Sequence, residues 1–150
     1  MGLKSQIETD LKAALLGGDR FKGEVLRGLK AAILNEEVAK NLREEGLPDE
    51  AIEQLIAREI KKRNDSATQY EAAGRPELSE TERKEAAILA EYQAEQLSEA
   101  DIQTVVMRVI SEQGATSMAQ MGQVIGAVKK ELGNSADGAL VAQLVKNALQ

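Results

Sequence analysis

The helical pattern of this chain is set by residues 3–33, which read LKSQIETDLKAALLGGDRFKGEVLRGLKAAI. Leucine or isoleucine recurs at every fourth position from Leu3 to Leu15, and this spacing puts the apolar side chains on one face of an α-helix. Gly17-Gly18 ends that helix because glycine favours the residue that follows a last helical turn. The stretch therefore predicts an amphipathic helix over residues 3–16 that is followed at once by a second helix.

The second helix begins after Asp19, which can cap it, and is predicted to run to about Glu45, where Gly46 stops it. Its expected apolar stripe consists of Val25, Leu26, Leu29, Ile33, Val38 and Leu42. The acidic pairs Glu36-Glu37 and Glu44-Glu45 are interpreted as solvated helix surface and not as a metal site or an acid/base pair, because adjacent helical residues point about 100° apart and each pair lies among polar residues.

Two further helices are predicted before residue 98. One opens at Pro48-Asp49 and ends before Gly74-Arg75-Pro76, and the other runs from about Glu77 to Glu95. Beyond Ser98 the pattern changes to three short helices, whose expected caps are Ser98, Thr116 or Ser117, and Asp137. Of the 19 Lys and Arg residues, 15 precede residue 98, which supports a domain boundary there.

The predicted fold is all-α, with a long-helix N-terminal domain of about four helices over residues 1–97 and a compact three-helix domain over residues 98–150. The composition agrees, since 43% of the 150 residues are hydrophobic but only 2% are aromatic. A core of Ala, Leu, Ile, Val and Met is typical of packed helices.

Several kinds of chemistry are excluded by composition. The chain has no Cys and no His, so it lacks disulfides, Cys or His zinc ligands and the Ser-His-Asp and Cys-His nucleophile pairs. We identify no catalytic residue, metal site or cofactor site. The net charge of −6 disfavours general DNA binding or attachment to an anionic membrane. No apolar signal or membrane-spanning stretch is found, so we expect a cytoplasmic protein.

The densest basic cluster is Arg58-Glu59-Ile60-Lys61-Lys62-Arg63. Arg58 and Lys62 lie four residues apart on one helical face with Lys61 beside them, and such charges can hold an RNA backbone through its phosphates. A second interpretation stays open, in which the cluster is solvated surface and Glu59 and Arg63 form an ordinary i,i+4 pair.

A smaller basic patch consists of Lys129-Lys130, with Lys146 as a further candidate. Lysines near a helix C-terminus also suit the helix dipole, so a structural role is equally open. The turn Gly133–Gly138 precedes a helix N-terminus that could accept an anion, but it contains no Lys or Arg. We interpret the spacing Gly122-x-x-x-Gly126 as close helix packing.

Ordered motifs along nearly the whole chain resemble the GatB/YqeY family, and they comprise Ala31-Ala-Ile-Leu-Asn-Glu-Glu37, Arg63-Asn-Asp-Ser66, Tyr70-Glu-Ala-Ala-Gly-Arg75, Gly114-Ala-Thr-Ser-Met118 and Ala136-Asp-Gly138. This family resembles the C-terminal tail of the B subunit of the tRNA-dependent amidotransferase, a tail that helps to hold tRNA. The resemblance implies a helical two-domain fold and a partner in tRNA or in the tRNA amidation and aminoacylation machinery. It also carries the family label of carbon–nitrogen ligase activity with glutamine as amido donor.

The sequence departs from this family pattern in two places. Gly133-Asn134-Ser135 and Ala139 stand where relatives commonly carry basic residues, which makes that loop a poorer phosphate site. Gln93-Ala94 replaces a common Leu-Pro pair, so the fourth helix is expected to continue toward Ser98.

Three hypotheses follow. The first is a non-catalytic helical module that binds tRNA or another structured RNA through Arg58, Lys61, Lys62 and Arg63 with help from Lys129, Lys130 and Lys146. The second is an amidotransferase in its own right, although no ATP site or amidase constellation is found. The third is a protein–protein adaptor that docks a partner helix on the C-terminal domain.

Overall fold

The computed structural model describes residues 2–150, and within them it contains helices and no strand. The all-α class predicted from the sequence is therefore confirmed. The chain divides into two compact units, of which unit 1 ends at Gln93 and unit 2 begins at Ala94. The boundary suggested at residues 97 and 98 stays a prediction about independently folding domains.

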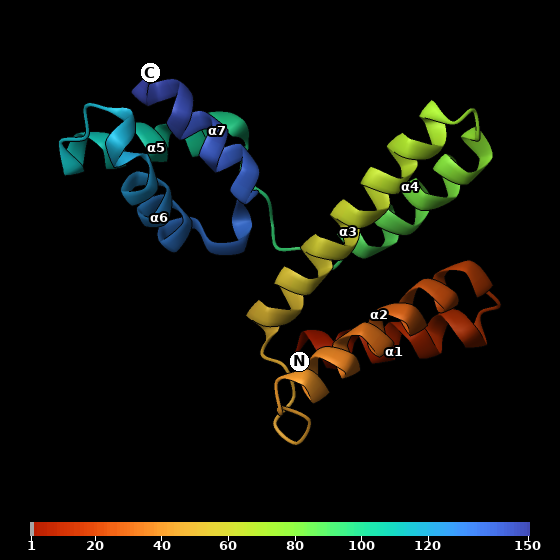
Figure 1. Ribbon diagram of the computed structural model, residues 1–150. Helices are drawn as coiled ribbons and strands as arrows, with labels where there is room; N and C mark the ends of the chain where they lie inside the picture. The colour runs from red at the N-terminus through yellow and green to blue at the C-terminus, as the bar shows by residue number, and fades with distance from the viewer. Residues whose placement is uncertain (1) are drawn as a thin grey trace. The chain divides into compact units, whose positions relative to one another are not determined.

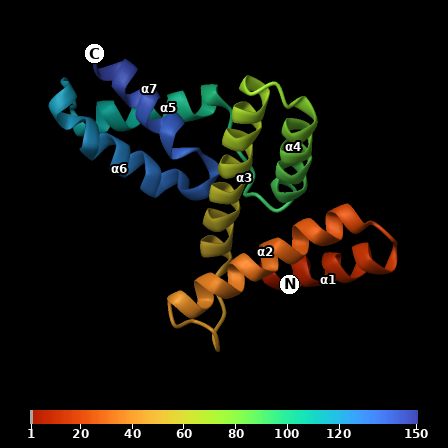
Figure 2. The ribbon, with the colours of Figure 1, turned by 45° about the vertical axis from the view of Figure 1, so that its right-hand side comes forward.

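Unit 1 consists of two helical hairpins that share one core. The first pairs α1 (Leu3–Leu16) with α2 (Arg20–Ala39), and the second pairs α3 (Asp49–Ala72) with α4 (Pro76–Ala90) (Figures 1 and 2). The Asp19 side chain caps α2 by accepting the N–H of Lys22 at 3.1 Å, as predicted. The largest fully buried apolar side chains of this core come from all four helices and are Ile7, Leu26, Ile33, Ile52, Ile56 and Leu89.

The last two turns of α2 differ from the prediction. Val38 was expected in the core but is 59% exposed, whereas Glu37, expected at the surface, is only 1% exposed. The stripe set by Leu29 and Ile33 continues at Glu37, because a step of four residues stays on one helical face and a step of five does not. The interpretation of Glu36-Glu37 as a solvated pair is therefore wrong for Glu37.

The buried Glu37 carboxylate also explains why α2 ends at Ala39 and not near Glu45. Its Oε2 accepts the backbone N–H of Leu47 at 2.9 Å and lies 2.9 Å from the Lys4 ammonium. The segment after the helix folds back over this carboxylate, and Asn41 adopts a left-handed φ of 57° at the turn. One charged side chain thereby joins α1, α2 and the loop that leads to α3.

The fourth helix is shorter than predicted. It ends at Ala90, and the expectation that Gln93-Ala94 would extend it toward Ser98 is wrong. Tyr92 leaves the helical path, enters the core with 6% of its surface exposed and donates its hydroxyl hydrogen to Asp10 at 2.6 Å. Continuing the helix would cost this burial and this hydrogen bond.

Unit 2 is built from three helices and two short 3-10 turns, which are α5 (Glu99–Gln113), η1 (Met118–Gln120), α6 (Met121–Leu132), η2 (Gly133–Ser135) and α7 (Gly138–Leu149). The predicted caps at Ser98 and Asp137 are confirmed by side-chain hydrogen bonds to the N–H groups of Asp101 and Ala139. Ser117 caps η1, which leads directly into α6. The core is rich in valine, with Val106, Val124, Val128, Val141 and Val145 all fully buried.

Candidate nucleic-acid interface

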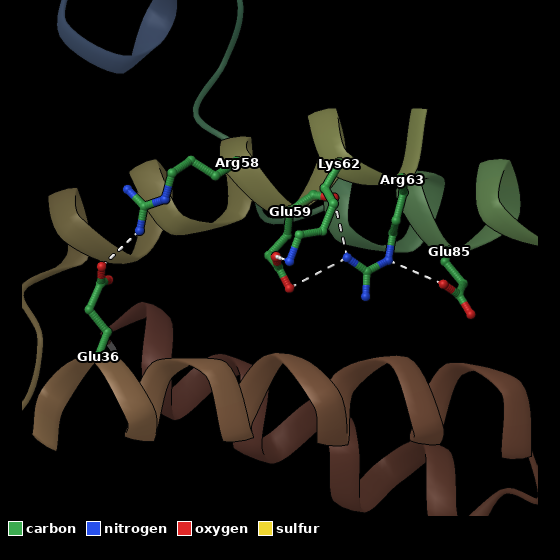
Figure 3. A network of polar contacts seen from close by, with 6 residues as sticks. All are labelled: Glu36, Arg58, Glu59, Lys62, Arg63 and Glu85. Atoms are coloured by element: carbon green, nitrogen blue, oxygen red, sulfur yellow. Dashed lines mark hydrogen bonds and ion pairs between the residues drawn. The ribbon is translucent and has the colours of Figure 1, made fainter. Parts of the chain in front are cut away.

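The basic cluster predicted from the sequence lies on α3, and its charges are largely neutralised. Arg58 reaches across to α2, where its Nη2 lies 2.7 Å from Glu36 Oε1 (Figure 3). Lys62 lies 3.5 Å from Glu59 of its own helix. Arg58 and Lys62 are still well exposed, so phosphate could compete for them, since exposed ion pairs contribute only about 0–1 kcal/mol.

Arg63 is the most enclosed member of the cluster, with 19% of its side chain exposed. Its Nε donates to Glu85 on α4 at 3.2 Å, and its Nη1 donates to the Glu59 carbonyl at 3.2 Å and lies 3.5 Å from the Glu59 carboxylate. The i,i+4 pair with Glu59 that the sequence suggested is thus formed. Arg63 mainly links α3 to α4.

Lys61 behaves differently from its three neighbours. Its side chain is exposed, and within residues 2–150 it forms no ion pair or hydrogen bond. The structure therefore separates the cluster into a free lysine, two exposed cations with acidic partners and one enclosed arginine. The acidic partners Glu36 and Glu85 lie 22 residues from the arginines they bind, so sequence spacing alone could not reveal them.

The cations of unit 2 show the reverse pattern. Lys129 and Lys130 lie in the last turn of α6, and Lys146 lies in the last turn of α7. All three are exposed, and none has an ion-pair partner in the part of the chain that the structure describes. The one arginine of unit 2, Arg108, is held by Glu112 at 3.0 Å and by Glu131, and these hydrogen bonds raise its pKa.

Lys129 also lies against the turn Gly133–Gly138, which itself contains no Lys or Arg. A Cβ atom added to Gly138 would lie 3.2 Å from both Cε and Nζ of Lys129, so the lysine crosses the first residue of α7. The ammonium that the turn Gly133–Gly138 lacks is supplied by the preceding helix. Lys146 follows eight residues later, about 12 Å along the axis of α7.

Two other features are absent from the described residues. Residues 2–150 contain no group of three or more Asp and Glu side chains arranged to hold a metal ion. None of the helices described is long and apolar enough to cross a membrane.

Known proteins place the chain in a family. One match is the Altered inheritance of mitochondria protein 41, mitochondrial, of Lachancea thermotolerans, which is 29% identical over 110 residues that make up 72% of this chain. The matched segment covers 58% of that relative, so the chain spans little more than half of it. The relative's name refers to mitochondria, and the cytoplasmic location expected for the present chain stays a prediction. A family model described as Yqey-like protein matches residues 4–149, nearly the entire sequence, and the chain therefore belongs to the YqeY family.

Proposed function

We propose that this chain is a non-catalytic accessory module that binds tRNA or another structured RNA, with its main phosphate contacts in unit 2. The observation that carries the proposal is the availability of Lys129, Lys130 and Lys146, three exposed ammonium groups that no carboxylate neutralises in the described structure. Phosphate contacts of this kind position a protein on RNA without reading its sequence.

Membership of the YqeY family supports the proposal, because this family resembles the tRNA-holding tail of the amidotransferase B subunit. The placement of Lys129 across Gly138 supports it as well, since the lysine then lies beside the free N–H groups at the start of α7. In unit 1, Lys61 is a further candidate contact. Arg58 and Lys62 would have to exchange an acidic partner for a phosphate, and Arg63 acts as a structural link.

The experiment that tests the proposal is a titration of labelled tRNA at about 50 and about 200 mM salt. Three phosphate contacts predict that the affinity falls about 20- to 40-fold between these concentrations, because each contact releases condensed counterions. The variant K129Q/K130Q/K146Q removes the three lysines and is expected to weaken binding strongly in low salt and to flatten the salt dependence.

A matched control is K12Q/K30Q/K84Q, which removes the same charge from exposed lysines of unit 1 outside the cluster. It is expected to change the affinity little. The proposal fails if wild-type binding has a midpoint above about 0.1 mM in low salt, which is no tighter than non-specific binding. If both triple variants lose affinity equally, the assignment of the contacts to Lys129, Lys130 and Lys146 is wrong.

The proposal assigns no reaction to this chain. The sequence lacks His and Cys, and no catalytic residue is assigned from it. Incubating the purified chain with mischarged tRNA, glutamine and ATP is expected to give no amidated product, and turnover above the rate without protein would contradict the proposal.

A further inference from the structure

Unit 1 contains a groove that the proposed function does not use. It has a volume of about 530 Å³ and lies between the N-terminal half of α2 and the side chains of Arg63 on α3 and Glu85 on α4. This volume falls within the range of small-molecule sites, which is about 300–1,000 Å³. The groove therefore lies where the two hairpins of unit 1 face each other, and all the residues that line it belong to unit 1.

One side of the groove carries an aromatic ring that is available for stacking. Phe21 is the only phenylalanine of the chain, and it stays 40% exposed although it lies on a helix that packs into the core. Two turns further along α2, Gly28 also lines the groove, and a Cβ atom added there would meet no heavy atom within 4 Å. The helix thus lines the groove with an exposed ring at one end and with an open position at Gly28, about 10 Å further along its axis.

The charges that line the groove sum to zero, because Arg20 and Arg63 are matched by Glu24 and Glu85, but they are paired unevenly. Glu24 lies 3.4 Å from Arg27, and Glu85 is held by Arg63. Arg20 also lines the groove, and its guanidinium has no acidic partner within residues 2–150. An anionic group at the groove is therefore favoured near Arg20, beside the exposed ring of Phe21.

Arg63 and Glu85 complete the polar lining. The Nε and Nη1 groups of Arg63 are used by Glu85 and Glu59, while Nη2 has no partner and faces α2 in Figure 3. Only Oε2 of Glu85 accepts a hydrogen bond from Arg63, so Oε1 stays available as an acceptor. The groove can therefore offer an N–H donor and a carboxylate acceptor to the edge of a polar flat ring.

We infer that this groove binds one unpaired nucleotide, with its base stacked on Phe21, its base edge toward Arg63 and Glu85, and its phosphate at Arg20. An aromatic ring beside a cation is the usual arrangement for binding single-stranded nucleic acid. The nucleotide can belong to a single-stranded segment of RNA or can be a free mononucleotide, since both carry the same groups. The inference deepens the proposed function and rests on it.

The test uses the full chain and a fluorescein-labelled hexa-adenylate, because the adenine amino group can donate to Glu85. Gly28→Met places a side chain in the groove from α2, and its Cβ would meet no heavy atom within 4 Å. Gly122→Met is its matched control, because Gly122 is also a helical glycine with open space beside it but lies in unit 2, two turns before Lys129. Phe21→Ala removes the ring, and Leu16→Ala removes a side chain that is 90% exposed near the same end of the hairpin.

We expect Gly28→Met and Phe21→Ala each to weaken hexa-adenylate binding at least about fivefold, as loss of one stacked base does, and both controls to change it less than about twofold. Competition with adenosine monophosphate distinguishes the two sources. Displacement at a similar concentration identifies a free nucleotide as the ligand, whereas much weaker displacement identifies a strand, and either result supports the groove.

Unchanged binding by Gly28→Met, or equal losses in the variants and their controls, would overturn the inference. If tRNA binds through the lysines of unit 2 but hexa-adenylate does not bind, the inference is wrong and the proposed function stands. If neither RNA binds, both are wrong.

Discussion

Replacing Glu37 by alanine probes the polar group that joins α1, α2 and the following loop. The side chain is 1% exposed and accepts the N–H of Leu47 at 2.9 Å, so its removal leaves a buried donor without a partner and opens a small cavity. An unsatisfied buried N–H costs about 1–3 kcal/mol, and with the lost packing we expect Glu37→Ala to destabilise unit 1 by about 2–4 kcal/mol.

Glu37→Gln separates the charge from the hydrogen bond, because an amide oxygen can still accept from Leu47. The ion pair with Lys4 is only partly shielded from water, since 39% of the Lys4 side chain is exposed. Its loss is therefore expected to cost about 1 kcal/mol, near the upper end for exposed pairs.

The assay is urea unfolding followed by tyrosine fluorescence. Tyr70 and Tyr92 are the only tyrosines of the chain and both lie in unit 1, so the signal reports on this unit alone. Glu44→Ala is the control, because Glu44 is an exposed acid in the loop after α2 and its removal should change stability by less than about 0.5 kcal/mol. The reasoning is refuted if Glu37→Ala costs no more than Glu44→Ala.

The pH dependence gives a second check on Glu37. The hydrogen bond from Lys4, opposed by burial, holds the pKa of the Glu37 carboxyl below its ordinary value of 4.5. Protonation therefore occurs first in the unfolded chain as the pH falls, and the stabilisation from the charge is complete above about pH 4.5 and lost below it. The stability difference between wild type and Glu37→Gln should be constant from pH 6 to 8 and should shrink on acidification. A difference that persisted to pH 3 would contradict this account.

Four further substitutions test other parts of the fold. Val38→Lys should change the free energy of unfolding by less than about 0.5 kcal/mol, whereas Ile33→Ala should cost about 2–5 kcal/mol, and urea unfolding distinguishes an exposed from a buried position. Tyr92→Phe removes the hydrogen bond to Asp10, and circular dichroism should show a melting temperature of unit 1 lowered by about 4–8 °C, the shift for about 1 kcal/mol in a domain of this size. Gly114→Ala places a side chain at a φ of 62°, and unit 2 should lose about 1 kcal/mol in the same measurement. An unchanged melting temperature in either variant, or a large loss in Val38→Lys, would contradict the structure.

The sequence predicts the fold well where local rules decide it. The helix starts after Asp19 and Ser98 follow from side chains that cap their own helices, and the stop at Gly17-Gly18 follows from the tolerance of glycine for a left-handed φ, which is 80° at Gly18. These features depend on residues within one turn of the boundary. Local chemistry is therefore sufficient to place them.

The prediction failed where distant residues decide the outcome. Nothing near Glu37 indicates that Lys4, 33 positions earlier, supplies the charge that lets this carboxylate be buried. Likewise the path of the chain after Ala90 depends on a hydrogen bond between Tyr92 and Asp10, which lie 82 positions apart. Residue type alone predicts that valine is buried and glutamate exposed. Here the tertiary contacts bury Glu37 and leave Val38 exposed.

The candidate site shows the same limit of prediction from sequence. Phosphate binds to basic side chains that no acidic side chain already neutralises. Unit 1 holds the denser basic cluster but also the acids that neutralise it. In unit 2 the six acids have other positions or partners: one precedes α5, two lie in its first turn, two hold Arg108 and one caps α7. They are Glu95, Glu99, Asp101, Glu112, Glu131 and Asp137. Its three lysines remain free for this reason. The distribution of acids, more than the density of basic residues, therefore directs the proposed RNA contact to unit 2.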